Sequence, residues 1–173
     1  MTWGDSESAS PDWEERLGMG KFVVGVGNVL LRDEGIGCHV AHALESVPLS
    51  DAEVIDAGTC PDVLQLVANA DKLVIVDAVK GGGMPGQIYR FRPEDIDLEE
   101  KRVLSLHDIS LIDSLKSTQL RHNVGETVII GVEPRELSWG LELSPELQEK
   151  MPQIIDVVLD ELNNTKSKGE TKC

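Results

Sequence analysis

Residues 21–47 read KFVVGVGNVLLRDEGIGCHVAHALESV and combine the patterns of a strand, a loop and a helix. The stretch 21–27 is almost continuously apolar, which is typical of a strand covered on both faces. After the loop, apolar side chains recur every three or four residues from Ile36 to Val47 and predict an amphipathic helix. A strand followed closely by a helix favours an α/β fold with a mostly parallel sheet.

The rest of the chain repeats this alternation. We expect further strands at residues 53–57, 72–79, 87–92 and 126–132, and helices at 62–69, 107–118 and 144–162. Ser144 and Pro145 suit the N-cap and first position of the last helix, which Pro152 should bend or split. The link 80–86 is too short for a crossover helix, so the strands that it joins should form an antiparallel pair. The prediction is a three-layer α/β/α fold whose twisted sheet has about five strands, one of them antiparallel.

The charge lies mainly on the body of the chain. With 31 acidic and 16 basic residues among 173, the net charge is −15, of which −13 belongs to residues 21–162. We expect these residues to form a single α/β domain, with a flexible acidic leader at 1–20 and a flexible tail at 163–173. This balance argues against a nucleic-acid partner, because phosphate binding needs clustered Lys and Arg.

Nothing in the sequence suggests a membrane span or a secretion signal. The longest uncharged apolar run covers only residues 22–31, and the first residues lack a basic region followed by an apolar one. The three cysteines are an odd number without CxxC spacing, which disfavours a disulfide framework or a zinc knot. We expect a cytoplasmic monomer that does not bind membranes.

The glycines after the first strand invite comparison with a dinucleotide-binding fingerprint. The third glycine of that motif falls on Leu30, and Asp33 and Glu34 would repel a pyrophosphate. Nucleotide binding is therefore only a lesser alternative. Asp33 is expected to cap the following helix, whereas Glu34, which lies beside Gly35, is a candidate site residue.

Other candidate residues lie at the ends of the predicted strands and at a helix start. Asp77 follows four aliphatic residues at the carboxyl end of a strand, where α/β proteins bind ligands, and Asp56 has a similar position. Either carboxylate could instead cap a turn. His107 stands at the expected start of a helix, and Glu34, Asp77 and His107 would form a ligand set that suits Zn, Ni, Fe or Mn. The glycine triplet after Asp77 is interpreted as a flexible lip.

The other histidines and the cysteines are weaker candidates. We expect three histidines to be surface residues: His39, His42 and His122. Cys38 is the only candidate for a thiol nucleophile paired with a histidine. It is discounted because its helix position points away from the strand ends.

Four stretches occur in an order that resembles the hydrogenase maturation endopeptidases. They are GVGNVLLRDEGIG (25–37), LVIVDAV (73–79), the helix-start His107, and GVEPRELSWGLELSPEL (131–147). The resemblance covers residues 21–162 and implies a twisted sheet between helices. It also implies metal contacts from Glu34, Asp77 and His107. The implied activity is removal of a C-terminal extension from the large-subunit precursor of a nickel–iron hydrogenase, after nickel insertion.

The resemblance implies that nickel is carried by the precursor and is recognised by the protease. Another divalent ion, such as zinc or cadmium, could take its place at the site. The favoured mechanism uses the ion to polarise the scissile carbonyl or a water, with Asp77 or Glu34 as general base. An aspartic-protease dyad of Asp56 and Asp77 is the alternative mechanism. A non-catalytic, metal-dependent maturation chaperone or adaptor remains an alternative function.

Overall fold

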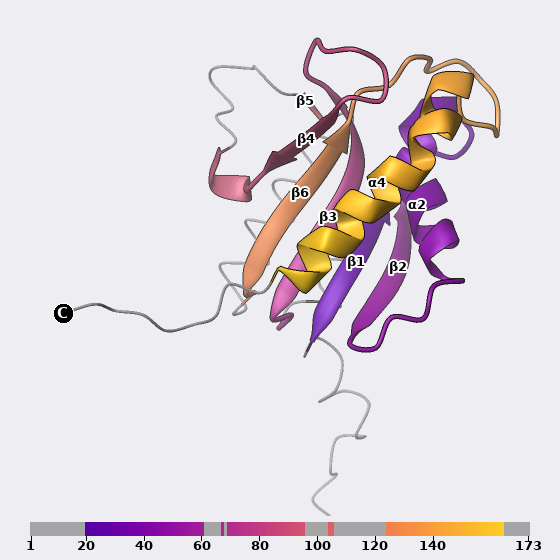
Figure 1. The fold of residues 1–173 in the computed structure, drawn as a ribbon. Coiled ribbons are helices and arrows are strands. Elements are labelled where there is room, and N and C mark those ends of the chain that lie inside the picture. The colour runs from indigo at the N-terminus through magenta and orange to yellow at the C-terminus, as the bar shows by residue number, and fades with distance from the viewer. Residues whose placement is uncertain (1–19, 61–66, 68, 96–103, 106–123, 165–173) are drawn as a thin grey trace, which may run out of the picture.

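The computed structural model describes residues 20–60, 67, 69–95, 104–105 and 124–164. Within these residues the chain forms a six-stranded sheet and four helical elements (Figure 1). The strands are β1 (Lys21–Val26), β2 (Ala52–Gly58), β3 (Lys72–Lys80), β4 (Ile88–Phe91), β5 (Leu104–Ser105) and β6 (Glu126–Val132). The helical elements are η1 (Arg32–Gly35), α2 (Ile36–Leu44), η3 (Pro93–Asp95) and α4 (Pro145–Asn163).

The sheet confirms the predicted mostly parallel arrangement and corrects one pairing. Its order is β2-β1-β3-β6-β4, and only β4 and the two-residue β5 run antiparallel to their partners. We expected β4 to pair with β3, but β6 lies between them and pairs with both. A link of seven residues reaches up to about 24 Å, whereas stepping over one strand takes about 10 Å. The link is therefore long enough to cross β6.

Helices α2 and α4 cover the same face of the sheet (Figure 1). Apolar side chains from alternate positions of the strands, among them Val23, Val74, Val76 and Val128, pack against them. The positions between these, such as Val24 and Ile75, form a second core on the opposite face. The helix expected at 107–118 lies outside the described residues, as does most of the one expected at 62–69. Successive side chains of each strand therefore point alternately into the two cores.

Helix α4 begins at Pro145, as its sequence predicts, and continues unbroken to Asn163. Of the two outcomes expected at Pro152, a bend or a split, the split does not occur. Ser144 occupies the N-cap position, but its side chain does not cap the helix. Its hydroxyl is used elsewhere, as described below. The described part of the chain holds no helix whose length and apolar character would let it cross a bilayer.

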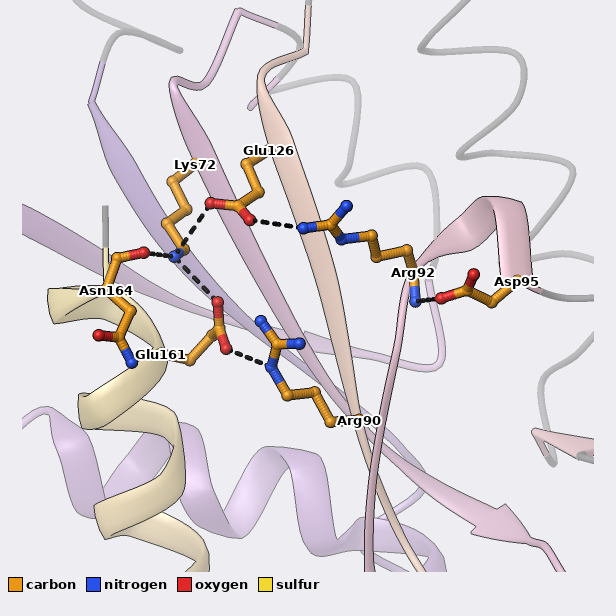
Figure 2. A network of polar contacts seen from close by, with 7 residues as sticks. All are labelled: Lys72, Arg90, Arg92, Asp95, Glu126, Glu161 and Asn164. Carbon is orange, nitrogen blue, oxygen red and sulfur yellow. Dashed lines mark hydrogen bonds and ion pairs between the residues drawn. The ribbon is translucent and has the colours of Figure 1, made fainter. Parts of the chain in front are cut away.

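An ion network with a buried lysine at its centre joins the end of α4 to the amino edge of the sheet (Figure 2). At its centre is Lys72, whose side chain is 1% exposed and whose Nζ lies 2.9 Å from Glu161 Oε1 and 3.3 Å from Glu126 Oε2. The same Nζ donates a hydrogen bond of 2.7 Å to the carbonyl of Asn164. Arg90 pairs with Glu161, and Arg92 pairs with Glu126. This network lies at the edge opposite the candidate site.

Candidate active site

The glycines of the 25–37 loop allow helix α2 to pack directly on the strand ends. A Cβ at Gly37 would lie 2.2 Å from the carbonyl oxygens of both Val26 and Val76, and one at Gly25 would lie 2.1 Å from the carbonyl of Gly37. Backbone therefore fills the space beside these two glycines. The glycine pattern that resembles a dinucleotide fingerprint serves helix–sheet packing, which removes the main support for nucleotide binding.

Glu34 and Asp77 both lie at the carboxyl edge of the parallel strands. Asp77 is fully buried in β3, opposite Gly131 of β6, and its Oδ1 accepts a hydrogen bond of 2.8 Å from the N–H of Ala78. Glu34 is half-buried in η1, which contacts β3. The carbonyl oxygen of Glu34 lies 2.2 Å from where a Cβ of Gly27 would be, just beyond the end of β1. The fold therefore brings the backbones that carry these two acids to one edge of the sheet.

Asp56 does not join them. It lies on β2, and β1 separates that strand from β3, so Asp56 and Asp77 are about two strand spacings, or roughly 10 Å, apart. Asp56 and Val76 are both in register with Gly25, so Asp77, one residue further along, points to the opposite face of the sheet. Two carboxylates must lie within hydrogen-bond reach to share a proton. The structure therefore does not form the dyad of Asp56 and Asp77.

The contacts of Asp56 are with helix α2 and its own strand. His42 Nε2 lies 2.9 Å from Asp56 Oδ2, and the N–H of Gly58 donates to Oδ1 at 2.9 Å. Burial raises the pKa of Asp56, but the neighbouring polar groups of Cys38, Gly58 and His42 outweigh it and hold the pKa below its usual value. Asp56 is therefore a charged partner of α2.

Cys38 lies in the same neighbourhood and is a poor nucleophile. Its buried thiol donates to the carbonyl of Gly27 at 3.3 Å. Burial, and after it the carboxylate of Asp56, raise the pKa of Cys38 to about 12, so the thiol stays protonated at neutral pH. Of the neighbouring histidines, His42 is exposed as expected, whereas His39 is half-buried, and burial lowers its pKa.

Asp33 has a role that the sequence did not reveal. The expectation that it caps α2 is wrong, because Gly35 holds the N-cap position and no side chain caps the helix. Asp33 is instead fully buried and accepts hydrogen bonds of 2.9 Å from the N–H groups of Arg135 and Glu136. It also accepts one of 2.7 Å from the N–H of Ser144 and one of 2.8 Å from its hydroxyl. One carboxylate thus fixes the loop that carries Glu34 to residues 135–144.

Asp33→Asn is expected to lower the free energy of unfolding by about 2 kcal/mol, because an amide group would face N–H donors in place of one carboxylate oxygen. Urea denaturation of the purified protein measures this change. Glu142→Gln, an exposed acid on the segment that Asp33 holds, is the matched control and should leave stability unchanged. Equal stability of the Asp33→Asn protein would contradict the role assigned to Asp33.

Glu133 orders the glycine triplet after β3. Its Oε2 accepts hydrogen bonds from the N–H groups of Gly81 (2.8 Å) and Gly83 (3.2 Å) and from the hydroxyl of Tyr89 (2.7 Å). Burial raises the pKa of Glu133, but these hydrogen bonds outweigh it and hold the pKa below its ordinary value. The triplet, which we expected to be a flexible lip, is therefore tied to the end of β6.

Comparison with known proteins identifies the family. A sequence model described as hydrogenase maturation protease matches residues 38–161. The chain belongs to the hydrogenase maturation protease family. The hydrogenase 2 maturation protease of Escherichia coli is 32% identical to this maturation protease over 149 residues, which span 83% of this chain and 91% of that protein. The hydrogenase 3 maturation protease of E. coli is 31% identical over 112 residues, which span 63% of this chain and 69% of that protein.

Solved structures of maturation proteases share the fold. The hydrogenase maturating endopeptidase HybD from E. coli superposes with a TM-score of 0.74 at 30% identity, covering 86% of this chain and 94% of that one. The [NiFe] hydrogenase maturation protease HybD from Thermococcus kodakarensis gives a TM-score of 0.70 at 25% identity, covering 82% of this chain and 98% of that one. The predicted α/β fold and the identification as a protease are thus confirmed.

The acids of this maturation protease have the chemistry of ligands for a divalent cation, since carboxylate oxygens suit several such ions. His107 and His122 lie outside the described residues, so the set of Glu34, Asp77 and His107 stays a prediction. Within the described ranges, no three residues among His, Cys, Asp and Glu are grouped closely enough to hold a metal ion.

Proposed function

We propose that this protease removes a C-terminal extension from the large-subunit precursor of a nickel–iron hydrogenase after nickel has been inserted. In this proposal Glu34, Asp77 and His107 contact the nickel that the precursor carries. The observation that supports it most is the placement of Glu34 and Asp77 at the carboxyl edge of the sheet, where α/β proteins bind their ligands. Family membership supports the class of reaction.

The proposed hydrolysis uses one of the two acids as the general base. The precursor's nickel supplies a Lewis acid that polarises the scissile carbonyl. Asp77 or Glu34 accepts a proton from the attacking water while the water oxygen bonds to the carbonyl carbon. The C–N bond then breaks, and the proton passes to the departing amine. Asp77 suits the role of base because it is buried and its orientation is fixed by the N–H of Ala78.

The proposal extends to the isolated protein and to its location. Zinc or cadmium would occupy the same site in place of the precursor's nickel, because carboxylate and imidazole ligands accept several divalent ions. The reaction would take place in the cytoplasm. The free thiols of Cys38 and Cys60 support a reducing compartment.

Mass spectrometry of the precursor before and after incubation tests this function. The mass of a nickel-loaded precursor should fall by that of its C-terminal extension, and the mass of a nickel-free precursor should not change. A nickel-loaded precursor that binds the protein but keeps its full mass would instead indicate the non-catalytic adaptor.

A further inference from the structure

An exposed apolar patch lies on two neighbouring segments of the chain. Among the side chains that the structure describes, the large apolar ones that are exposed are Leu30, Met84, Trp139 and Leu141. Leu30 is 48% exposed, Trp139 is 78% exposed and Leu141 is 65% exposed. These three residues form the apolar patch. Exposed apolar side chains gathered in one place mark interaction surfaces more often than isolated ones do.

Backbone hydrogen bonds hold the two segments of the patch together. The N–H of Gly140 donates to the carbonyl of Leu30 at 3.0 Å, and the N–H of Arg32 donates to the carbonyl of Gly140 at 2.9 Å. The carboxylate of Asp33 fixes the same two segments from the buried side. The patch is therefore preorganised, so a partner would not have to order these segments when it binds.

The apolar patch borders the candidate site. Leu30 precedes Glu34 by four residues, and the N–H of Glu34 donates to the carbonyl of Leu31 at 3.2 Å. Leu30 and the proposed metal-contacting acid thus belong to one short segment, to which the segment of Trp139 and Leu141 is hydrogen-bonded. A partner that reaches Glu34 with a metal lies within reach of Leu30.

Two ion pairs lie beside the patch. Arg32 Nε lies 3.6 Å from Glu136 Oε1, and Arg135 Nε lies 3.5 Å from Glu146 Oε1. These pairs and the exposed Glu142 form a charged rim around the apolar side chains. An apolar centre with a charged rim is the usual composition of a protein interface, and tryptophan is a frequent hot-spot residue.

We propose that the apolar patch is the surface on which the nickel-loaded precursor docks, through an apolar segment next to its metal. This inference rests on the proposed function. A second copy of this chain is a poorer occupant, because each copy carries a net charge of −15 and the two would repel. The patch would position the precursor so that its metal meets Glu34 and Asp77.

Binding without cleavage tests the docking surface. The Asp77→Asn protein serves as the background, and its affinity for nickel-loaded precursor is measured by surface plasmon resonance. Adding Trp139→Ala and Leu141→Ala to this background should raise Kd at least about tenfold. In the active protein, the same pair of changes should raise KM at least about tenfold and leave kcat unchanged. Met84→Ala, which removes another exposed apolar side chain on a different loop, is the control and should change neither Kd nor KM.

The outcomes separate the docking surface from the reaction. An unchanged Kd and KM after the double substitution would overturn the docking surface, as would an equal loss with Met84→Ala. A wild-type dimer in sedimentation that the double substitution dissociates would assign the patch to a second copy. In a further outcome, the wild-type protein binds the precursor without shortening it, while the double substitution weakens binding tenfold. That result would support the docking surface and contradict the proposed cleavage of the precursor.

Discussion

Asp77→Asn is expected to lower the rate of precursor processing by at least about a hundredfold while the protein stays folded. Asparagine has the shape of aspartate, and its amide oxygen can keep the hydrogen bond from the N–H of Ala78. It cannot accept a proton from water, and it brings no negative charge to a cation. Quantitative mass spectrometry of cleaved and uncleaved precursor over time gives the rate, and circular dichroism checks the fold.

Two further substitutions separate this explanation from its alternatives. Glu34→Gln should lose activity as Asp77→Asn does, because both acids are proposed to meet the precursor's nickel. Asp56→Asn should keep processing within a few-fold of the wild-type rate, because Asp56 points to the other face of the sheet and is paired with His42. Full activity of the Asp77→Asn protein would overturn the proposed site. A loss in Asp56→Asn as large as that in Asp77→Asn would restore the dyad of aspartates.

The strands were predictable because their signal is local. Continuous Val, Ile and Leu runs predicted β1, β3 and β6 to within one residue at each end. The partner of β4 was not predictable, because pairing depends on which strand edge is free once β6 has paired with β3. The two-residue β5 is too short to leave a pattern. Sequence periodicity therefore predicted the elements, and tertiary packing decided their neighbours.

The candidate site shows the same division. Asp77 could be placed at the carboxyl edge because it ends an apolar run, and Glu34 stood out because Gly35 follows it. Asp33 was misassigned as a cap because its four donors come from residues more than a hundred positions away. The opposite orientations of Asp56 and Asp77 follow from the strand register, which a single sequence does not contain.

Lys72 begins β3, and its burial leaves no local signal in the sequence. Its burial depends on carboxylates from β6 and α4, and it places a cation where the end of α4 meets the sheet (Figure 2). Lys72→Met is expected to lower the free energy of unfolding by about 3 kcal/mol, because it leaves two carboxylates without their shared cation. Arg90 and Arg92 remain to pair with them, which places the loss at the lower end of the range for a broken buried pair.

Lys21→Met is the matched control for this substitution. Lys21 is in register with Lys72 at the start of the adjacent strand, but its partner, Asp51, is exposed, so the loss of stability should be much smaller.

Urea denaturation of both variants across a range of pH adds a second measurement. Burial raises the pKa of Glu161, but Arg90 and Lys72 lower it by more than burial raises it. The pKa of Glu161 therefore lies below its ordinary value in the folded protein.

A carboxylate with a depressed pKa stabilises the fold above its unfolded-state pKa, and this contribution is lost as the pH falls through the folded-state value. The stability difference between the wild type and Lys72→Met should therefore narrow on acidification, as Glu161 takes up a proton. A difference that stays constant down to the acid transition would mean that Lys72 stabilises the protein by packing its aliphatic chain. Equal losses for Lys21→Met and Lys72→Met would show that burial of the network contributes nothing beyond a surface pair.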